Sequence, residues 1–257
     1  MVVFPGAGVI SFIFVFLLFF SMQKLLHREI QYILLIIFRN PTLVIALFSL
    51  LLFPGVFIHE VSHFLSAIIL RVKVLKFSIV PRSLKNGQLR MGYVETKRTD
   101  FIRDSLIGIA PLISGLLLVA YIANHHLGLK NFDSSFITTN IQSIFPILEN
   151  FKNQNDPGIW LYLCFCISST MVPSASDRQS WKNVIFGITI IIIILVLFGT
   201  GDWLINTVSL QFELWLIRLT FIIFISLLIH LVIFIPLLIT RFLISKTTGL
   251  QILKNRS

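Results

Sequence analysis

An HExxH pattern, His59-Glu60-Val61-Ser62-His63, is the part of this chain with the clearest chemistry. On a helix, residues four positions apart share one face, so His59 and His63 would lie side by side, one turn apart. This spacing suits two imidazole ligands on one Zn²⁺, and Glu60, on the adjacent flank, would accept the proton of a water bound to the metal. The pattern therefore predicts a zinc site with hydrolytic chemistry.

The residues around this pattern are those of a membrane span. The segment 42–70 is almost wholly apolar, and ionisable side chains inside a membrane are costly and tend to mark function. Across its 257 residues the chain is 56% hydrophobic and contains 25 Phe, whereas soluble domains have an apolar share of about 45–50%. We therefore expect an integral, multi-pass protein of the lipid bilayer, with residues 1–257 forming one membrane-embedded domain.

Apolar segments divide the chain into elements that could carry the site. A hydrocarbon core is crossed by about 20 helical residues, and the candidates are about 7–22, 42–70, 105–123, 158–172, 184–200 and 214–238. They predict an all-α polytopic membrane fold with about six transmembrane helices. The more polar interval 23–40 predicts a separate interfacial helix. Pro54-Gly55 predicts a kink that either opens a water path to the site or serves helix packing.

The basic residues indicate how the chain is oriented. A net charge of +10 would suggest nucleic acid in a soluble protein, but in a membrane protein it reports cytoplasmic loops and contact with anionic headgroups, so we expect no nucleic-acid partner. The interval 71–104 has nine Lys and Arg against three acids. This interval should be cytoplasmic. We expect a bacterial or archaeal cell membrane, with the active site toward the cytoplasmic side.

The same interval, 71–104, changes its periodicity. Residues 72–80 are rich in β-formers, residues 89–95 alternate again, and Asn86-Gly87 between them is a strong hairpin signal. The pattern predicts a small β-hairpin on the cytoplasmic side. It is either a surface hairpin near the headgroups or an exposed strand edge that pairs with an extended substrate, in which case Asn86 and Gly87 are candidate substrate-binding positions.

A catalytic zinc needs a third protein ligand and keeps its fourth position for water. Apart from Glu60, Asp177 is the one acid in a short polar break directly at the end of an apolar span, in the region 158–181. Pro173 stops a regular helix there, and the Ser-rich turn can bend back to bring Asp177 to the metal. Alternatively, Asp177 caps the following helix.

These features, in this order, resemble the site-2 protease family of intramembrane zinc metalloproteases. The resemblance covers about residues 44–181 and rests on HEVSH in a membrane helix, a basic hairpin region, the element Gly108 to Gly115 and a distal Pro-xxx-Asp. It implies that His59, His63 and Asp177 bind zinc, that Glu60 is the catalytic base, and that the substrate is a membrane-spanning helix. Ser114 stands where the family commonly has an Asn that orients the substrate. The family usually has Gly after the Asp, where this chain has Arg178.

Two other functions remain open. One is a membrane zinc protease whose third ligand is a distal Glu, with Glu95, Glu149 or Glu213 in that role. The other is a non-catalytic metal-binding scaffold or transporter. The intact His-Glu-His set favours an enzyme, because a purely structural zinc does not need Glu60. Substrate identity and oligomeric state are not predicted.

Overall fold

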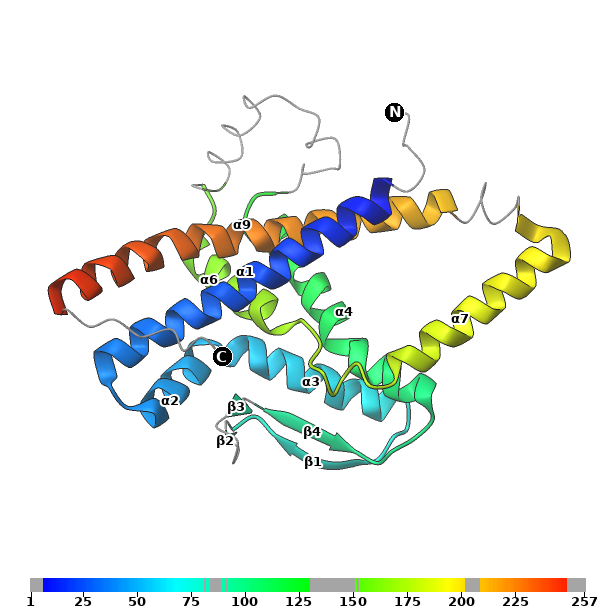
Figure 1. Ribbon diagram of the computed structural model, residues 1–257, viewed down its shortest axis with the longest axis horizontal. Coiled ribbons are helices and arrows are strands. Elements are labelled where there is room, and N and C mark those ends of the chain that lie inside the picture. The colour runs from blue at the N-terminus through cyan, green and yellow to red at the C-terminus, as the bar shows by residue number, and fades with distance from the viewer. Residues whose placement is uncertain are drawn as a thin grey trace.

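The protein is built mainly from helices (Figure 1). The structure is a computed structural model and describes residues 7–80, 82–83, 89–90, 92–129, 151, 153–201 and 209–248. The described helices are α1 (Ala7–Phe38), α2 (Pro41–Leu51), α3 (Phe53–Ile69), α4 (Phe101–His126), α6 (Pro157–Thr170), α7 (Trp181–Leu195), the π-helix η3 (Val196–Thr200) and α9 (Ser209–Thr248). The described strands are β1 (Val74–Ser78), β2 (Arg82–Ser83), β3 (Leu89–Arg90) and β4 (Tyr93–Thr96).

The described helices support the expected membrane architecture. Four of them are long and apolar enough to cross a bilayer: α1, α4, α7 with η3, and α9. The bent pair α2 and α3 makes a fifth if it is counted as one span, and α6 is a shorter apolar helix of 14 residues. A mainly helical, membrane-type fold is thus confirmed. The number of about six spans and the side that faces the cytoplasm stay predictions.

The interval 23–40 does not form the separate interfacial helix expected from its polarity. Helix α1 instead runs unbroken through it to Phe38. One of its charged residues lies inside the fold: Glu29 is buried and accepts two hydrogen bonds from Arg241 Nη1 of α9, at 2.8 and 2.6 Å. Lys24 places its Nζ 4.1 Å from the centre of the Phe20 ring. Pairing and side-chain contacts of this kind let a helix carry charge through apolar surroundings.

The segment 42–70 is broken rather than straight, as Pro54-Gly55 led us to expect. Helices α2 and α3 meet at Leu52 with a bend of 71°. Pro54 has no N–H for the carbonyl of Leu50, and its ring crowds that carbonyl, so the helix cannot continue regularly. Gly55 lies against the carbonyl of Cys166 in α6, where a Cβ would have no room. The glycine therefore serves the packing of α3 on α6.

The predicted hairpin follows α3 and lies along it in Figure 1. Strand β1 pairs antiparallel with β4, so that Phe77 lies opposite Val94, and β2 pairs with β3 further along. The predicted strand pairing is therefore confirmed. The turn residues Asn86 and Gly87 lie outside the described residues.

The core gathers around α3, α4 and α6. Helices α1 and α9 pack along each other beside them in Figure 1. Fully buried apolar side chains of α1, α4, α6 and α9, and Leu52 between α2 and α3, lie in this region; among them are Phe19, Leu26, Leu52, Val119, Cys164 and Ile223. Helix α7 with η3 extends away from this body and has no buried residue. Helix α3, which contains His59 and His63, is thus packed against several other helices, whereas α7 is largely exposed.

Candidate metal centre

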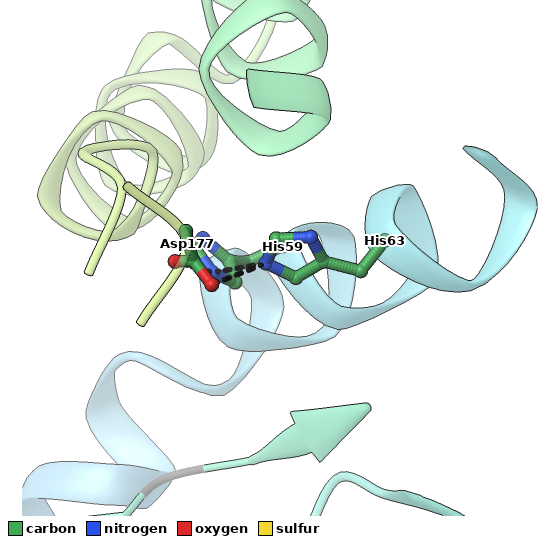
Figure 2. A group of neighbouring side chains, drawn as sticks. All are labelled: His59, His63 and Asp177. Carbon is green, nitrogen blue, oxygen red and sulfur yellow. Dashed lines mark hydrogen bonds and ion pairs between the residues drawn. The ribbon is translucent and has the colours of Figure 1, made fainter. Parts of the chain in front are cut away.

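Three side chains with metal-binding atoms meet at one point (Figure 2). His59 and His63 come from α3, and Asp177 comes from the turn between α6 and α7. The Nε2 atoms of the two histidines are 3.2 Å apart. His63 Nε2 lies 3.5 Å from one oxygen of Asp177, and His59 Nε2 lies 3.9 Å from the other. Among the described residues, these three form a group that could hold a metal ion.

The spacing of these atoms fits a tetrahedral zinc ion. Two ligand atoms each about 2.1 Å from such an ion are separated by about 3.4 Å. Two separations lie close to this value: 3.2 Å between the two Nε2 atoms and 3.5 Å from His63 Nε2 to one oxygen of Asp177; His59 Nε2 lies 3.9 Å from the other oxygen. Three protein ligands of the types His, His and carboxylate also leave the fourth position open, as catalytic zinc sites require. The residues present could therefore hold a metal ion, and their ligand types are compatible with zinc.

Each histidine is oriented by a backbone carbonyl. His59 Nδ1 lies 2.7 Å from the carbonyl oxygen of Thr170, and His63 Nδ1 lies 2.8 Å from that of Ile107. A carbonyl can only accept, so each Nδ1 carries a hydrogen and donates it. The lone pair of each ring then sits on Nε2, the atom that faces the other two ligands. Partners of this kind fix the tautomer and the ring orientation of zinc-binding histidines.

Asp177 is held by hydrogen bonds within the serine-rich turn that was predicted after Pro173. Ser174 N donates to Asp177 Oδ2 at 2.7 Å, and Asp177 N donates to Ser174 Oγ at 3.3 Å. Burial raises the pKa of the Asp177 carboxyl, but the contact with His63 and the hydrogen bonds from Ser174 outweigh it and lower the pKa to about 2. The carboxylate is therefore ionised at neutral pH, the form that binds metal. Asp177 does not cap α7, whose N-cap residue is Ser180.

Glu60 lies beside the three ligands on one wall of a cavity of about 820 Å³. It is 7% exposed. Strand β4 and the residue before it pass close by, with Gly92, Tyr93 and Val94 lining the same cavity. A Cβ placed on Gly92 would be only 2.7 Å from Glu60 Cγ and 2.9 Å from Oε1. The candidate base and the start of the strand are therefore in direct contact.

The cavity also reaches α1, which the sequence did not indicate. Gln23 lines it and donates a short hydrogen bond from Nε2 to the carbonyl of Ser169 in α6. The hydroxyl of Ser169 in turn pairs with His230 Nε2 of α9 at 3.1 Å. Because Thr170, which orients His59, directly follows Ser169, these bonds anchor the end of α6 next to the metal group.

Ser114 has a partner outside the cavity. Its hydroxyl lies 2.6 Å from the hydroxyl of Ser62 in α3 and donates to the carbonyl of Pro111 at 3.1 Å. It thus ties α4 to the metal helix. Ser114 is not among the described residues that line the cavity, and its role toward substrate stays a prediction. The other two predicted substrate positions, Asn86 and Gly87, lie outside the described residues.

The alternative carboxylate ligands are placed differently. Glu95 in β4 forms an ion pair with Lys76 of β1 at 3.6 Å. Glu213 belongs to α9, and its backbone lies against Gly8 of α1. Neither belongs to the group formed by the two histidines, and Glu149 lies outside the described residues. The turn that contains Asp177 supplies the third ligand atom instead.

Two glycines of α4 let neighbouring segments pack closely at the site; the sequence pointed to the element Gly108 to Gly115 but not to this packing role. The backbone of Gly108 lies against the carbonyl of Asp177, and that of Gly115 lies against the side chain of Met171, each without room for a Cβ. The signal was present, since two glycines seven residues apart share a helix face, and small residues let helices approach closely.

No family model, curated protein or solved structure matches this chain. The described residues show a His-His-Asp group able to hold a metal ion, beside a buried glutamate, in a chain of long apolar helices. A function has to be inferred from this site.

Proposed function

We propose that this protein is an intramembrane zinc metalloprotease that hydrolyses peptide bonds within or near the transmembrane segments of other membrane proteins. One observation carries the proposal: His59, His63 and Asp177 converge with matching ligand atoms on a cavity that also holds Glu60. Two of these ligands come from a helix of the bent apolar pair. The basic residues around the hairpin favour a site toward the cytoplasmic side.

The residues divide the chemistry among themselves. When bound, zinc supplies Lewis acidity, which lowers the pKa of water toward about 7 and polarises the scissile carbonyl. Glu60 takes one proton from the attacking water as the water oxygen bonds to the carbonyl carbon. Glu60 then gives this proton to the nitrogen as the carbon–nitrogen bond breaks, leaving an amine and a carboxylic acid, which releases the second proton of the water to solvent and becomes a carboxylate. The carbonyls of Thr170 and Ile107 keep the two imidazoles in the donor-to-metal orientation.

The hairpin favours a peptide substrate over a small molecule. A transmembrane helix hides its carbonyls in internal hydrogen bonds, so a protease of such helices must hold a short stretch of its substrate extended. Strand β4 pairs with β1 on one side, and Gly92, Tyr93 and Val94 line the cavity beside Glu60. An extended peptide could add to the edge of β4 by main-chain hydrogen bonds and pass in front of the metal group.

A non-catalytic scaffold or transporter would use the same three ligands, so Glu60 separates the two functions. A structural metal site has no task for Glu60, yet this acid is buried beside the ligands. Burial of an acidic side chain in a membrane protein costs free energy, so such a residue usually has a functional role. The contact between Glu60 and Gly92 further suggests a side chain whose position matters.

Glu60→Gln is the test. Gln is nearly isosteric with Glu and removes proton transfer, which typically contributes about 10²–10⁴-fold in rate. The purified protein, reconstituted in bilayers, would be given a panel of single-span substrates and analysed for zinc. We expect cleavage by the wild type, none detectable by the variant, and equal zinc in both. Cleavage by Glu60→Gln at the wild-type rate would exclude the mechanism, and a zinc-loaded wild type that cleaves no substrate would favour the scaffold.

A further inference from the structure

Helix α4 contains a proline at a position that affects one carbonyl in particular. Pro111 lies inside the continuous helix, four residues after Ile107. In a regular α-helix the carbonyl of residue 107 accepts the N–H of residue 111. Proline has no N–H, so this bond cannot form. The Ile107 carbonyl is thus left without its helical partner in an apolar span, where an unpaired carbonyl is costly.

The metal ligand His63 occupies this free carbonyl. His63 Nδ1 donates to it at 2.8 Å, and His63 is 7% exposed. Had residue 111 carried an N–H, that N–H would also bond to this oxygen along the helix axis, and His63 would have to share it through the second lone pair. The carbonyl that Pro111 leaves without a helical donor is therefore the one that accepts the hydrogen bond of His63.

His59 also donates its hydrogen bond to a carbonyl without a helical partner, in this case at the end of α6. This helix ends at Thr170, and its last carbonyls have no helical partners. If the helix continued, Ser174 N would bond to the Thr170 carbonyl. Instead Ser174 N donates to Asp177 Oδ2, and the Thr170 carbonyl accepts from His59 Nδ1. The end of α6 thus orients His59 through the Thr170 carbonyl, and the turn that follows it holds Asp177 through Ser174 N.

We infer that Pro111 is a positioning residue of the metal centre. By withholding an N–H, it keeps the Ile107 carbonyl available to His63 Nδ1, which turns His63 Nε2 toward the metal. The same turn of α4 contains Gly108, against which the carbonyl of Asp177 packs. The turn 107–111 therefore places two of the three ligands. This inference rests on the proposed zinc site and does not depend on proteolysis.

The test compares zinc affinity in three full-length variants, measured by competition with a chelator in lipid bilayers. Pro111→Ala restores an N–H to the helix, and we expect zinc to bind about 10–100-fold more weakly, the usual loss when a histidine ligand loses its orienting partner. Pro236→Ala is the matched control, because Pro236 also lies inside a helix, α9, that contributes no metal ligand. We expect its zinc affinity to equal that of the wild type.

The third variant separates the missing N–H from the proline ring. Pro111→lactic acid, introduced as an ester in the backbone, has neither the ring nor an N–H. We expect it to bind zinc as the wild type does. Pro111→Ala with wild-type affinity, or an ester variant with weakened affinity, would overturn the inference. If Pro111→Ala does not fold, the ester variant decides by the same criterion.

The outcomes also distinguish this inference from the proposed function. A wild type that binds zinc but cleaves no substrate would end the protease proposal and leave the role of Pro111 standing. Cleavage by the wild type together with unchanged zinc affinity in Pro111→Ala would do the reverse. A wild type that binds no zinc would overturn both.

Discussion

Gly92→Ala should impair catalysis without removing the metal. The new Cβ would lie 2.7 Å from Glu60 Cγ, 3.0 Å from Cδ and 2.9 Å from Oε1. Carbon atoms in favourable contact are about 3.5–4.0 Å apart, so Glu60 has to retreat by roughly 0.5–1 Å. The backbone itself should tolerate alanine, since Gly92 is not among the described glycines with positive φ. The perturbation therefore acts on the position of the general base.

The expected magnitude follows from this displacement. A misplacement of about 1 Å in an active site can cost about 10²-fold in rate. We expect kcat for a single-span substrate in bilayers to fall about 10–100-fold, equivalent to about 1.4–2.7 kcal/mol of activation free energy. Zinc content should stay at the wild-type level, because the three heavy atoms nearest to the added Cβ all belong to Glu60, which is not one of the metal ligands.

Gly158→Ala is the control, since a Cβ at this helix position meets nothing within 4 Å. It should cleave as the wild type does. Wild-type cleavage by Gly92→Ala would refute the idea that Glu60 must keep its place against the strand. Loss of zinc in Gly92→Ala would show instead that the strand supports the metal ligands, which would separate the observed effect from proton transfer.

Three further outcomes are expected. Asp177→Ala should lose zinc on metal analysis and cleave nothing, and undiminished occupancy with intact activity would remove Asp177 from the ligand set. Proline inserted into β1 or β4 should reduce cleavage while zinc stays bound, and unchanged cleavage would make the hairpin a surface feature. Arg241→Ala leaves Glu29 buried without its main partner; because the Arg241 side chain is about half exposed, the free energy of unfolding should fall by about 1–3 kcal/mol. In denaturation curves, Glu29→Leu combined with Arg241→Leu should recover much of this loss, and equal losses in the single and double variants would contradict the role of the pair.

The metal group was predictable because its signals are local. The i, i+4 histidines need only a helix, and Asp177 was recognised by a proline stop and a serine-rich turn at the end of an apolar segment. The structure brings all three together. The hairpin was likewise predictable from the β-forming residues of 72–80 and 89–95, the segments in which β1 and most of β4 lie.

What escaped prediction depends on contacts between distant segments. The first helix was predicted to end near residue 22 because charged residues follow and indicated an exposed segment. One of them, Glu29, is instead buried and paired with Arg241, more than two hundred positions away. The free carbonyl of Ile107 could be inferred from Pro111, but its partner His63 could not, since nothing local relates α3 to α4. Similarly, the closeness of Gly92 and Glu60 arises only when the hairpin folds back.

Helix α7 has a consequence for how this protein must be handled. Trp181, its first residue, follows Asp177 by four positions, yet no residue of α7 is buried. In a bilayer we expect acyl chains, rather than side chains of the described residues, to surround most of this helix. Because the serine-rich turn joins this helix to Asp177, we expect a change in the tilt of α7 with bilayer thickness to act on the carboxylate of the metal group. We therefore expect metal binding to differ between a thin detergent micelle and a bilayer of matching thickness.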